Sequence, residues 1–139
     1  MENPEKVVAD HKIFGCKHIG LGVLPGGSDN TIETVNEFLK KAKPVTRRIA
    51  DAGGYFMYHN HNFEFKDMGG EILMDKFAEY FDTDEFGFTL DVHWVKAAGH
   101  DPVDWLNKLK GRTPCVHFKD LLTMPNGKFR YAPVGYGEL

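Results

Sequence analysis

Four clusters of histidine and carboxylate side chains each follow a short apolar run in this sequence. The clusters are Tyr58-His59-Asn60-His61-Asn62-Phe63-Glu64, Leu90-Asp91-Val92-His93-Trp94, Val116-His117-Phe118-Lys119-Asp120 and Val134-Gly135-Tyr136-Gly137-Glu138. Imidazole and carboxylate donors without thiolates suit Mn, Mg, Co or Zn in a catalytic site better than a structural zinc knuckle. Donors that follow the strands of one parallel sheet meet at a single end of that sheet. The sequence therefore predicts one divalent metal ion at that end.

Each of these residues also has a structural interpretation, which the sequence leaves open. Asp91 could cap the turn that follows it, and His93 could be a hydrogen-bonded core histidine. His59 and His61 could form a polar patch, and Glu138 could be a solvated acid. The repeated placement of such donors after apolar runs favours the shared metal site over five separate roles.

Two further features beside these clusters suit the binding of a sugar. Lys119 places a cation next to the proposed metal, where it could hold a sugar oxygen or a phosphate; an ordinary surface ion pair with Asp120 is the alternative. Trp94 follows a strand end and could wall a substrate pocket, because aromatic side chains suit sugar rings. Trp105 has helical spacing with Leu109 and is predicted to lie in the core.

Strand and helix patterns alternate along the chain. Predicted strands begin near His18, Tyr55, Phe86, Pro114 and Ala132. Apolar residues with helical spacing predict helices over about 4–14, from an Asn30 cap to Gly53, over 71–81 and over 102–109. This order is typical of right-handed crossover units in a parallel sheet.

The second of these helices carries the clearest signals. Asn30 with Glu33 three places later resembles a capping box. Pro44 interrupts the pattern, and its ring removes a backbone donor and clashes with the preceding turn, so the sequence predicts a kink or a split there.

Composition excludes several classes of protein. With 139 residues, of which 42% are hydrophobic, the chain is expected to form one domain or part of one. A net charge of −3 without a basic stripe argues against binding to nucleic acid. The sequence has no apolar run of membrane-spanning length and no secretory signal, so a cytoplasmic location is expected. Cys16 and Cys115 are predicted to be buried free thiols.

The clusters resemble the motifs of the sugar phosphate isomerase/epimerase family. These xylose-isomerase-like TIM barrels also include inosose dehydratases, tagatose and psicose 3-epimerases and the endonuclease IV group. The resemblance covers nearly the whole chain and rests on Tyr58-His59-Asn60-His61-Asn62-Phe63-Glu64-Phe65, Leu90-Asp91-Val92-His93-Trp94 with Ala98-Gly99-His100-Asp101-Pro102, His117-Phe118-Lys119-Asp120 and Val134-Gly135-Tyr136-Gly137-Glu138.

The fold implied by this resemblance is α/β, a partial (β/α)8 TIM barrel with about five parallel strands and intervening helices. A full barrel has eight strands and about 250 residues. Residues 1–139 would then form a single domain that lacks the first two or three strand-helix units and the last helix. Such a sheet has two unpaired edges and an open inner face, so a homodimer or larger homo-oligomer is expected to cover them.

The resemblance also implies a set of metal ligands. The family usually holds one divalent ion with Glu, Asp, His and Glu from successive strands. Asp91, His117 and Glu138 match the last three positions. Where many relatives have Glu-Asn-His, this chain has His59-Asn60-His61, so either His59 replaces the first carboxylate or Glu64 fills its place.

The implied activity is that of a sugar isomerase or epimerase, with proton transfer next to a carbonyl through an enediolate. Glu64 and Glu138 are the candidate acid–base pair. Residues implied to bind substrate are His59, His61, Trp94 and Lys119. Activity could be weak or absent because part of the barrel is missing.

Two alternatives to the isomerase remain open, and a third is disfavoured. One is a non-catalytic metal- or sugar-binding half-barrel, and another is a lyase like the inosose dehydratases. A nuclease of the endonuclease IV type is disfavoured because the net charge is −3 and basic clusters are lacking.

Overall fold

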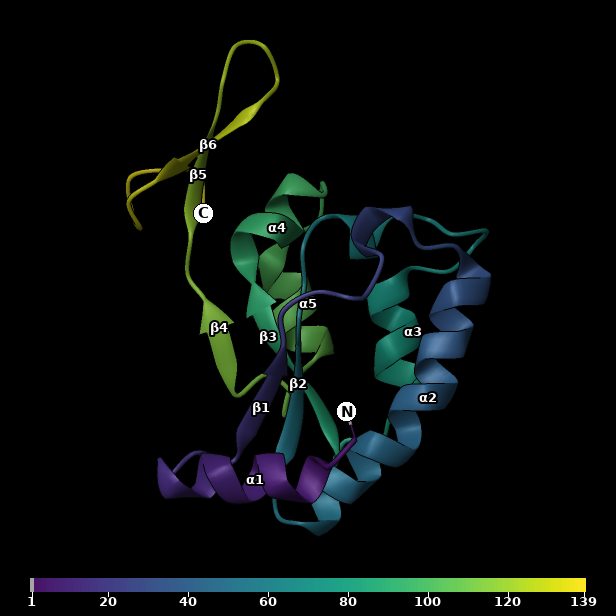
Figure 1. Cartoon of the computed structure of the whole chain (residues 1–139). Coiled ribbons are helices and arrows are strands. Elements are labelled where there is room, and N and C mark those ends of the chain that lie inside the picture. Colours follow the sequence, from purple (N-terminus) through teal and green to yellow (C-terminus); the bar gives the residue numbers. More distant parts are fainter. Residues whose placement is uncertain (1) are drawn as a thin grey trace.

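The computed structural model describes residues 2–139 and contains a curled sheet of four parallel strands with helices between them (Figure 1). The strands are β1 (His18–Leu21), β2 (Tyr55–His59), β3 (Phe86–Asp91) and β4 (Cys115–His117), and they lie side by side in that order. Sequential parallel strands with crossover helices are the arrangement of a TIM barrel, of which four strands are half. The predicted partial barrel is confirmed.

Residues 2–139 contain five α-helices and two short 3-10 helices; α1 precedes β1, and the others lie between successive strands of the parallel sheet. They are α1 (Pro4–Ile13), η1 (Gly27–Asp29), α2 (Ile32–Asp51), η2 (Phe63–Phe65), α3 (Leu73–Tyr80), α4 (Val92–Ala97) and α5 (Pro102–Lys108). The sequence predicted α1, α2, α3 and α5 but missed α4, which starts directly after the last residue of β3. Among residues 2–139, no helix combines the length and the apolar character that crossing a bilayer requires.

One face of the sheet packs against α2 and α3 and forms the core. Its strand residues alternate along β2 and β3 and are Phe56, Tyr58, Phe86, Phe88 and Leu90, all buried. The helices contribute Val35, Leu39, Ile49, Met74 and Phe77, each at most 1% exposed. Burying one such side chain stabilises the fold by about 1.5–3 kcal/mol. The opposite face of the sheet is left for the interior of a barrel.

The second helix, α2, differs from its prediction in two ways. Its N-cap is Thr31, whose hydroxyl accepts from the Thr34 amide while the Thr34 hydroxyl accepts from the Thr31 amide. Asn30 instead donates to loop carbonyls. Of the kink or split predicted at Pro44, the split is wrong, since one helix runs through this residue, and the kink stays a prediction. Both halves bury the same stripe, with Leu39 before Pro44 and Ile49 after it, so packing outweighs the single missing hydrogen bond.

The chain after β4 forms an antiparallel hairpin of β5 (Asp120–Thr123) and β6 (Phe129–Ala132), which projects beyond the end of the parallel sheet (Figure 1). The prediction of a fifth parallel strand near Ala132 is therefore wrong. A loop around Asn126 and Gly127 reverses the chain, with Gly127 at φ 75°. Asn-Gly is a strong hairpin signal that the sequence interpretation did not use.

Four backbone amides close the C-terminal segment around the Asp120 carboxylate. The amides of Leu121 and Gly137 donate to it at 2.8 Å, and those of Gly135 and Leu139 at 3.0 Å. A Cβ on Gly137 would lie 2.2 Å from the carboxylate, so only glycine fits. Burial by itself would raise the pKa of Asp120, but these amides hold it below its ordinary value.

Candidate metal centre

Three predicted metal-binding side chains meet at the carboxyl ends of β2, β3 and β4. Asp91 and His117 are register partners at the ends of β3 and β4, and His59 is the last residue of β2. One ligand atom from each of the three lies within 4.8 Å of the others. Among residues 2–139, this is the one group of three or more histidine, cysteine or acidic side chains that converges so closely.

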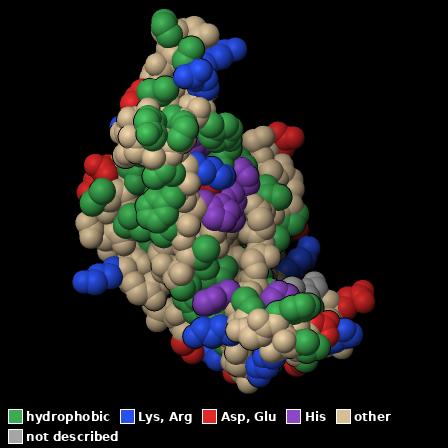
Figure 2. Space-filling view, turned by 90° about the vertical axis from the view of Figure 1, so that its left-hand side faces the viewer, with side chains coloured by type: hydrophobic (Ala, Val, Ile, Leu, Met, Phe, Trp, Pro, Cys, Tyr) green, Lys and Arg blue, Asp and Glu red, His purple; other side chains and the backbone are tan. Residues whose placement is uncertain are grey.

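The Asp91 carboxylate is the centre of the group. Its Oδ2 lies 3.2 Å from His59 Nε2 and 3.4 Å from His117 Nδ1, and the Lys119 ammonium also contacts this oxygen. Burial alone would raise the pKa of the fully buried Asp91, but hydrogen bonds from His59 and Lys119 lower it to about 2. Figure 2 shows the histidines gathered beside a basic side chain on the surface below the hairpin.

The orientation of His59 suits a metal ligand. Its Nδ1 lies 3.1 Å from the Gly22 carbonyl, which only accepts, so Nδ1 carries a proton. Nε2 is then the ring atom that faces Asp91 Oδ2, where it either donates a hydrogen bond or binds a metal ion. Two acceptors at this distance require a proton or a metal ion between them. A backbone carbonyl that fixes the tautomer of a histidine ligand is a common feature of metal sites.

Asn60 positions Asp91 through two hydrogen bonds. Its side-chain oxygen accepts from the Asp91 amide at 2.8 Å, and its nitrogen donates to the Asp91 carbonyl at 3.3 Å. The side chain is fully buried between the ends of β2 and β3. The sequence predicted no role for Asn60, although an amide between two histidines at the end of an apolar strand is a signal for one.

Glu64 lies outside the group of three. Its carboxylate is fully buried and accepts from the Tyr58 hydroxyl at 2.6 Å and from the His61 amide at 2.8 Å. The Tyr58 hydroxyl in turn accepts from the Leu24 amide at 3.1 Å. Glu64 thus ties the loop after β1 to the loop after β2, and burial raises its pKa. Its predicted roles as ligand and catalytic acid–base stay predictions.

Removing the Glu64 carboxylate should destabilise the fold. We expect Glu64→Ala to lower the free energy of unfolding by about 2–4 kcal/mol, since a buried hydroxyl and a buried amide both lose their partner. Urea unfolding followed by circular dichroism measures the loss. The matched control is Glu79→Ala on the exposed surface of α3, with an expected change within about 0.5 kcal/mol. A loss below about 1 kcal/mol for Glu64→Ala would contradict the structural role.

Glu138 is held by the hairpin. Its carboxylate accepts from the Thr123 amide at 2.6 Å and from the Thr123 hydroxyl at 2.9 Å, which lowers the pKa of Glu138. Its own amide donates to the Leu121 carbonyl at 2.9 Å. The structure does not bring Glu138 together with Asp91 and His117. Its predicted roles as fourth ligand and acid–base group stay predictions.

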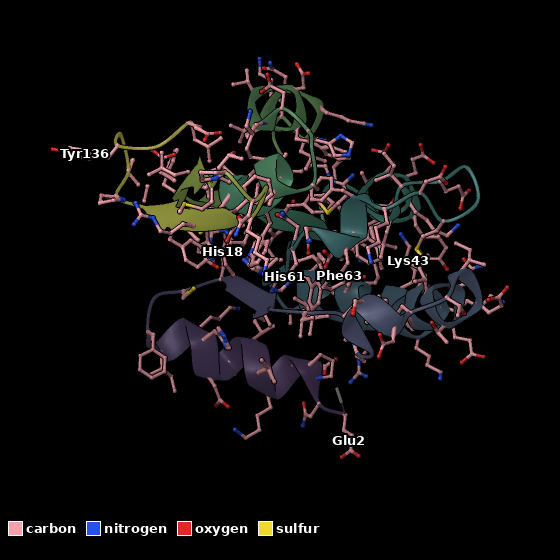
Figure 3. All side chains as sticks on the ribbon, turned by 90° about the horizontal axis from the view of Figure 1, so that it is seen from above. Glu2, His18, Lys43, His61, Phe63 and Tyr136 are labelled. Carbon is pink, nitrogen blue, oxygen red and sulfur yellow. The ribbon has the colours of Figure 1, made fainter. Side chains whose placement is uncertain are left out.

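Aromatic rings border the group on the side of His61. The His61 ring lies 4.8 Å from the ring of His59 and 5.6 Å from that of Trp94. It stacks on Phe63 at 5.5 Å, and Figure 3 shows these two residues side by side. Burial lowers the pKa of His61, and its Nδ1 has no hydrogen-bond partner among the described residues. The substrate-binding roles of His61, Trp94 and Lys119 stay predictions, whereas Trp105 is buried in the core as expected.

No protein-family model and no curated protein matches this chain, but solved structures do. It is similar to a sugar phosphate isomerase/epimerase from Parabacteroides distasonis, with a TM-score of 0.73 and 23% identity over 90% of this chain and 46% of that one. It is similar to the probable 3-DHS dehydratase AsbF from Bacillus anthracis, with a TM-score of 0.76 and 17% identity over 99% of this chain and 55% of that one. It is also similar to a xylose isomerase domain protein from Planctomyces limnophilus, with a TM-score of 0.70 and 18% identity over 99% of this chain and 49% of that one.

These likenesses establish the fold. The chain spans about half the length of each of these structures, as expected of a partial xylose-isomerase-like barrel. The resemblance inferred from the motifs is confirmed for the fold.

Proposed function

We propose that this chain binds one divalent metal ion and supplies half of the active site of a metal-dependent sugar isomerase or epimerase. The observation that carries the proposal is the convergence of His59, Asp91 and His117 on one point at the carboxyl ends of three neighbouring strands. Active sites of TIM-barrel enzymes lie at this end of the strands. The likeness in fold to a sugar phosphate isomerase/epimerase supports the choice of reaction.

The three side chains would hold the ion through two imidazole nitrogens and one carboxylate oxygen. This donor set suits Mn, Co or Zn better than Mg, which prefers an all-oxygen shell. A bound ion would supply Lewis-acid polarisation of a substrate carbonyl. Three protein ligands leave further coordination positions for a substrate.

Proton transfer would fall to the groups that border this site. His61 is half-buried, burial lowers its pKa, and its Nδ1 has no hydrogen-bond partner within residues 2–139, so this nitrogen is the candidate proton acceptor. Lys119 can hold a substrate oxygen or return a proton to it. Trp94 offers an aromatic face for a sugar ring. A substrate with a hydroxyl next to a carbonyl, such as a ketose or an inosose, fits these groups.

A dehydratase is the second candidate, since loss of a proton followed by loss of hydroxide needs much the same groups. The likeness in fold to the probable 3-DHS dehydratase supports it. A non-catalytic metal- or sugar-binding half-barrel is the third, and it is favoured by the position of Glu138 on the hairpin, away from the metal-binding group.

Solvent-exchange NMR tests the proposal. We expect the Mn-, Co- or Zn-loaded protein in deuterated water to exchange the proton next to the carbonyl in at least one member of a panel of ketoses and inososes. Exchange with retention of all hydroxyls indicates an isomerase or epimerase, and loss of a hydroxyl indicates a dehydratase. Binding of metal and sugar with no exchange would contradict a catalytic role and favour the binding protein.

Lys119 is expected to compete with the metal ion. Its ammonium contacts the same Asp91 oxygen that would coordinate the ion, so binding must displace it. We expect Lys119→Met to raise metal affinity roughly tenfold, or about 1.4 kcal/mol. Isothermal titration with Zn or Co measures the change. Lys96→Met on α4 is the control and should leave affinity within about twofold of the wild type. A weaker affinity in Lys119→Met would contradict the competition.

A further inference from the structure

We propose that two copies of this chain close a single eight-stranded barrel, with β4 of each copy pairing with β1 of the other. A barrel of this architecture needs eight parallel strands, and this chain supplies four in sequential order. A twofold rotation about the barrel axis keeps every strand direction unchanged. Two copies related in this way give eight strands that all point to the same mouth. The inference goes beyond the proposed function and does not depend on metal binding.

Both edges of the sheet are open to such pairing. Within residues 2–139, β1 and β4 each have a neighbour on one side alone, and the hairpin forms a separate sheet that rises above β4 (Figure 1). Edge strands of stable monomers are commonly protected by lysine, proline or a bulge. The sequences His18-Ile19-Gly20-Leu21 and Cys115-Val116-His117 contain neither lysine nor proline.

The inner face of the sheet has the composition of a barrel interior with room left in it. Its residues alternate with those of the core and are His18, Gly20, Tyr55, Met57, His59, Gly87, Thr89, Asp91, Cys115 and His117. Asp91, at the carboxyl end of β3, is the one charged side chain among these strand residues. A Cβ added to Gly20 would meet no atom within 4 Å, and Cys115 is exposed on the edge strand. The prediction of a buried Cys115 is wrong for the single chain, because no part of residues 2–139 covers this edge.

The register of the sheet selects which residues would meet. His59 pairs with Thr89, and Thr89 pairs with Cys115. Leu21 pairs with Tyr58, so position 22, the residue after β1, lies in the same row of neighbours as His59, Thr89 and Cys115. Half of a barrel with a shear of eight shifts the row by about four residues. Cys115 should therefore meet His18 of the second copy, since a shift in the other direction would leave β1 altogether.

This assembly completes the candidate site. Both groups of His59, Asp91 and His117 would lie at the same mouth and face each other across the barrel axis. The substrate side that one chain lacks would come from its partner. The two pairings between β4 and β1 would thus cover the open edges of both sheets and complete the mouth of the barrel.

Cysteine cross-linking tests the pairing, with light scattering as the independent measurement. Wild-type protein should have the mass of a dimer at micromolar concentration. In Cys16→Ser/His18→Cys, which retains Cys115, mild oxidation or a short thiol cross-linker should give a covalent dimer on a denaturing gel. Peptide mapping should place the link between positions 18 and 115.

The matched control is Cys16→Ser/Lys17→Cys, because position 17 is exposed and neighbouring strand residues point to opposite faces. It should cross-link at least fivefold less than the His18 variant. A wild-type monomer in light scattering overturns the proposal, whatever the variants do. A dimer in which positions 17 and 18 link equally, or in which neither links to Cys115, overturns the proposed strand pairing. Circular dichroism of both variants establishes that each is folded before the comparison.

Discussion

Asp91→Asn is expected to abolish tight binding of divalent metal. The carboxylate oxygen of Asp91 is the single atom that faces both His59 and His117, and it is the group's only negative charge. Asparagine keeps the shape of the side chain and can still cap α4, whose Trp94 amide donates to Asp91 Oδ1 at 3.4 Å. The fold should survive while the charge is lost. We expect affinity for Zn, Co or Mn to fall about a thousandfold, or about 4 kcal/mol.

Metal content after dialysis and isothermal titration both measure this effect. Asp101→Asn is the matched control, because Asp101 caps α5 in the same way but lies outside the group. It should bind metal as the wild type does. The double variant Asp91→Ala/His117→Ala removes two of the three ligands and should bind no more metal than a protein without a site. Equal metal content in this variant and the wild type would contradict the proposed metal centre.

The sequence predicted Asp91 and His117 as ligands because each ends a strand with an unambiguous apolar pattern, and the structure places both in the group of three. It left the first ligand open between His59 and Glu64, and local structure favours His59. After Asn62 the chain turns into η2, which carries Glu64 inward to Tyr58. A 3-10 turn of three residues has no periodic pattern to detect. Whether the Glu64 carboxylate points toward the core or toward the metal-binding group is then decided by packing.

The position of Glu138 could not be predicted from the sequence for a different reason. The motif around Glu138 resembles a strand end, but its position depends on the hairpin that precedes it. The Asn126-Gly127 loop and the four amides around Asp120 fold the C-terminal segment onto β5. Three of these amides, those of Gly135, Gly137 and Leu139, lie 15 to 19 positions from Asp120, a separation that neither helical nor strand periodicity reports.

The core was easier to predict than the site. β2 and β3 are apolar without clean alternation, as expected of parallel strands, and α2 has a continuous apolar stripe. These patterns were sufficient to place four strands and four of the five α-helices. The uninterrupted α2 shows that tertiary packing can outweigh a proline in the middle of a helix.

Arg112→Met is expected to cause the largest loss of stability of any single substitution described here. The Arg112 side chain is 8% exposed and donates from Nε and Nη2 to the Phe86 carbonyl at 3.1 Å. It also donates to the Phe81 carbonyl at 3.1 Å and to the Ala78 carbonyl. The end of α3, the start of β3 and the approach to β4 are thereby joined through one guanidinium.

Methionine fills a similar volume but leaves three buried carbonyls without this donor, so we expect the free energy of unfolding to fall by about 3–5 kcal/mol. That is a large part of the 5–15 kcal/mol typical of a domain. Arg112→Lys should lose about half as much, because one ammonium cannot reach all three carbonyls. Urea unfolding measures both, with the exposed Arg130→Met as control. A loss below about 1 kcal/mol in Arg112→Met would contradict the bridging role.

The variants at Arg112 and Asp91 should separate stability from metal binding, since the two residues act at opposite ends of β3. Asp91→Asn should leave the free energy of unfolding within about 1 kcal/mol of the wild type while removing the metal. Arg112→Met should weaken the fold, yet its folded fraction at low temperature should bind metal with nearly wild-type affinity. If Arg112→Met instead lost metal affinity while still folded, the register between β3 and β4 that pairs Asp91 with His117 would depend on the guanidinium as well as on the strand hydrogen bonds.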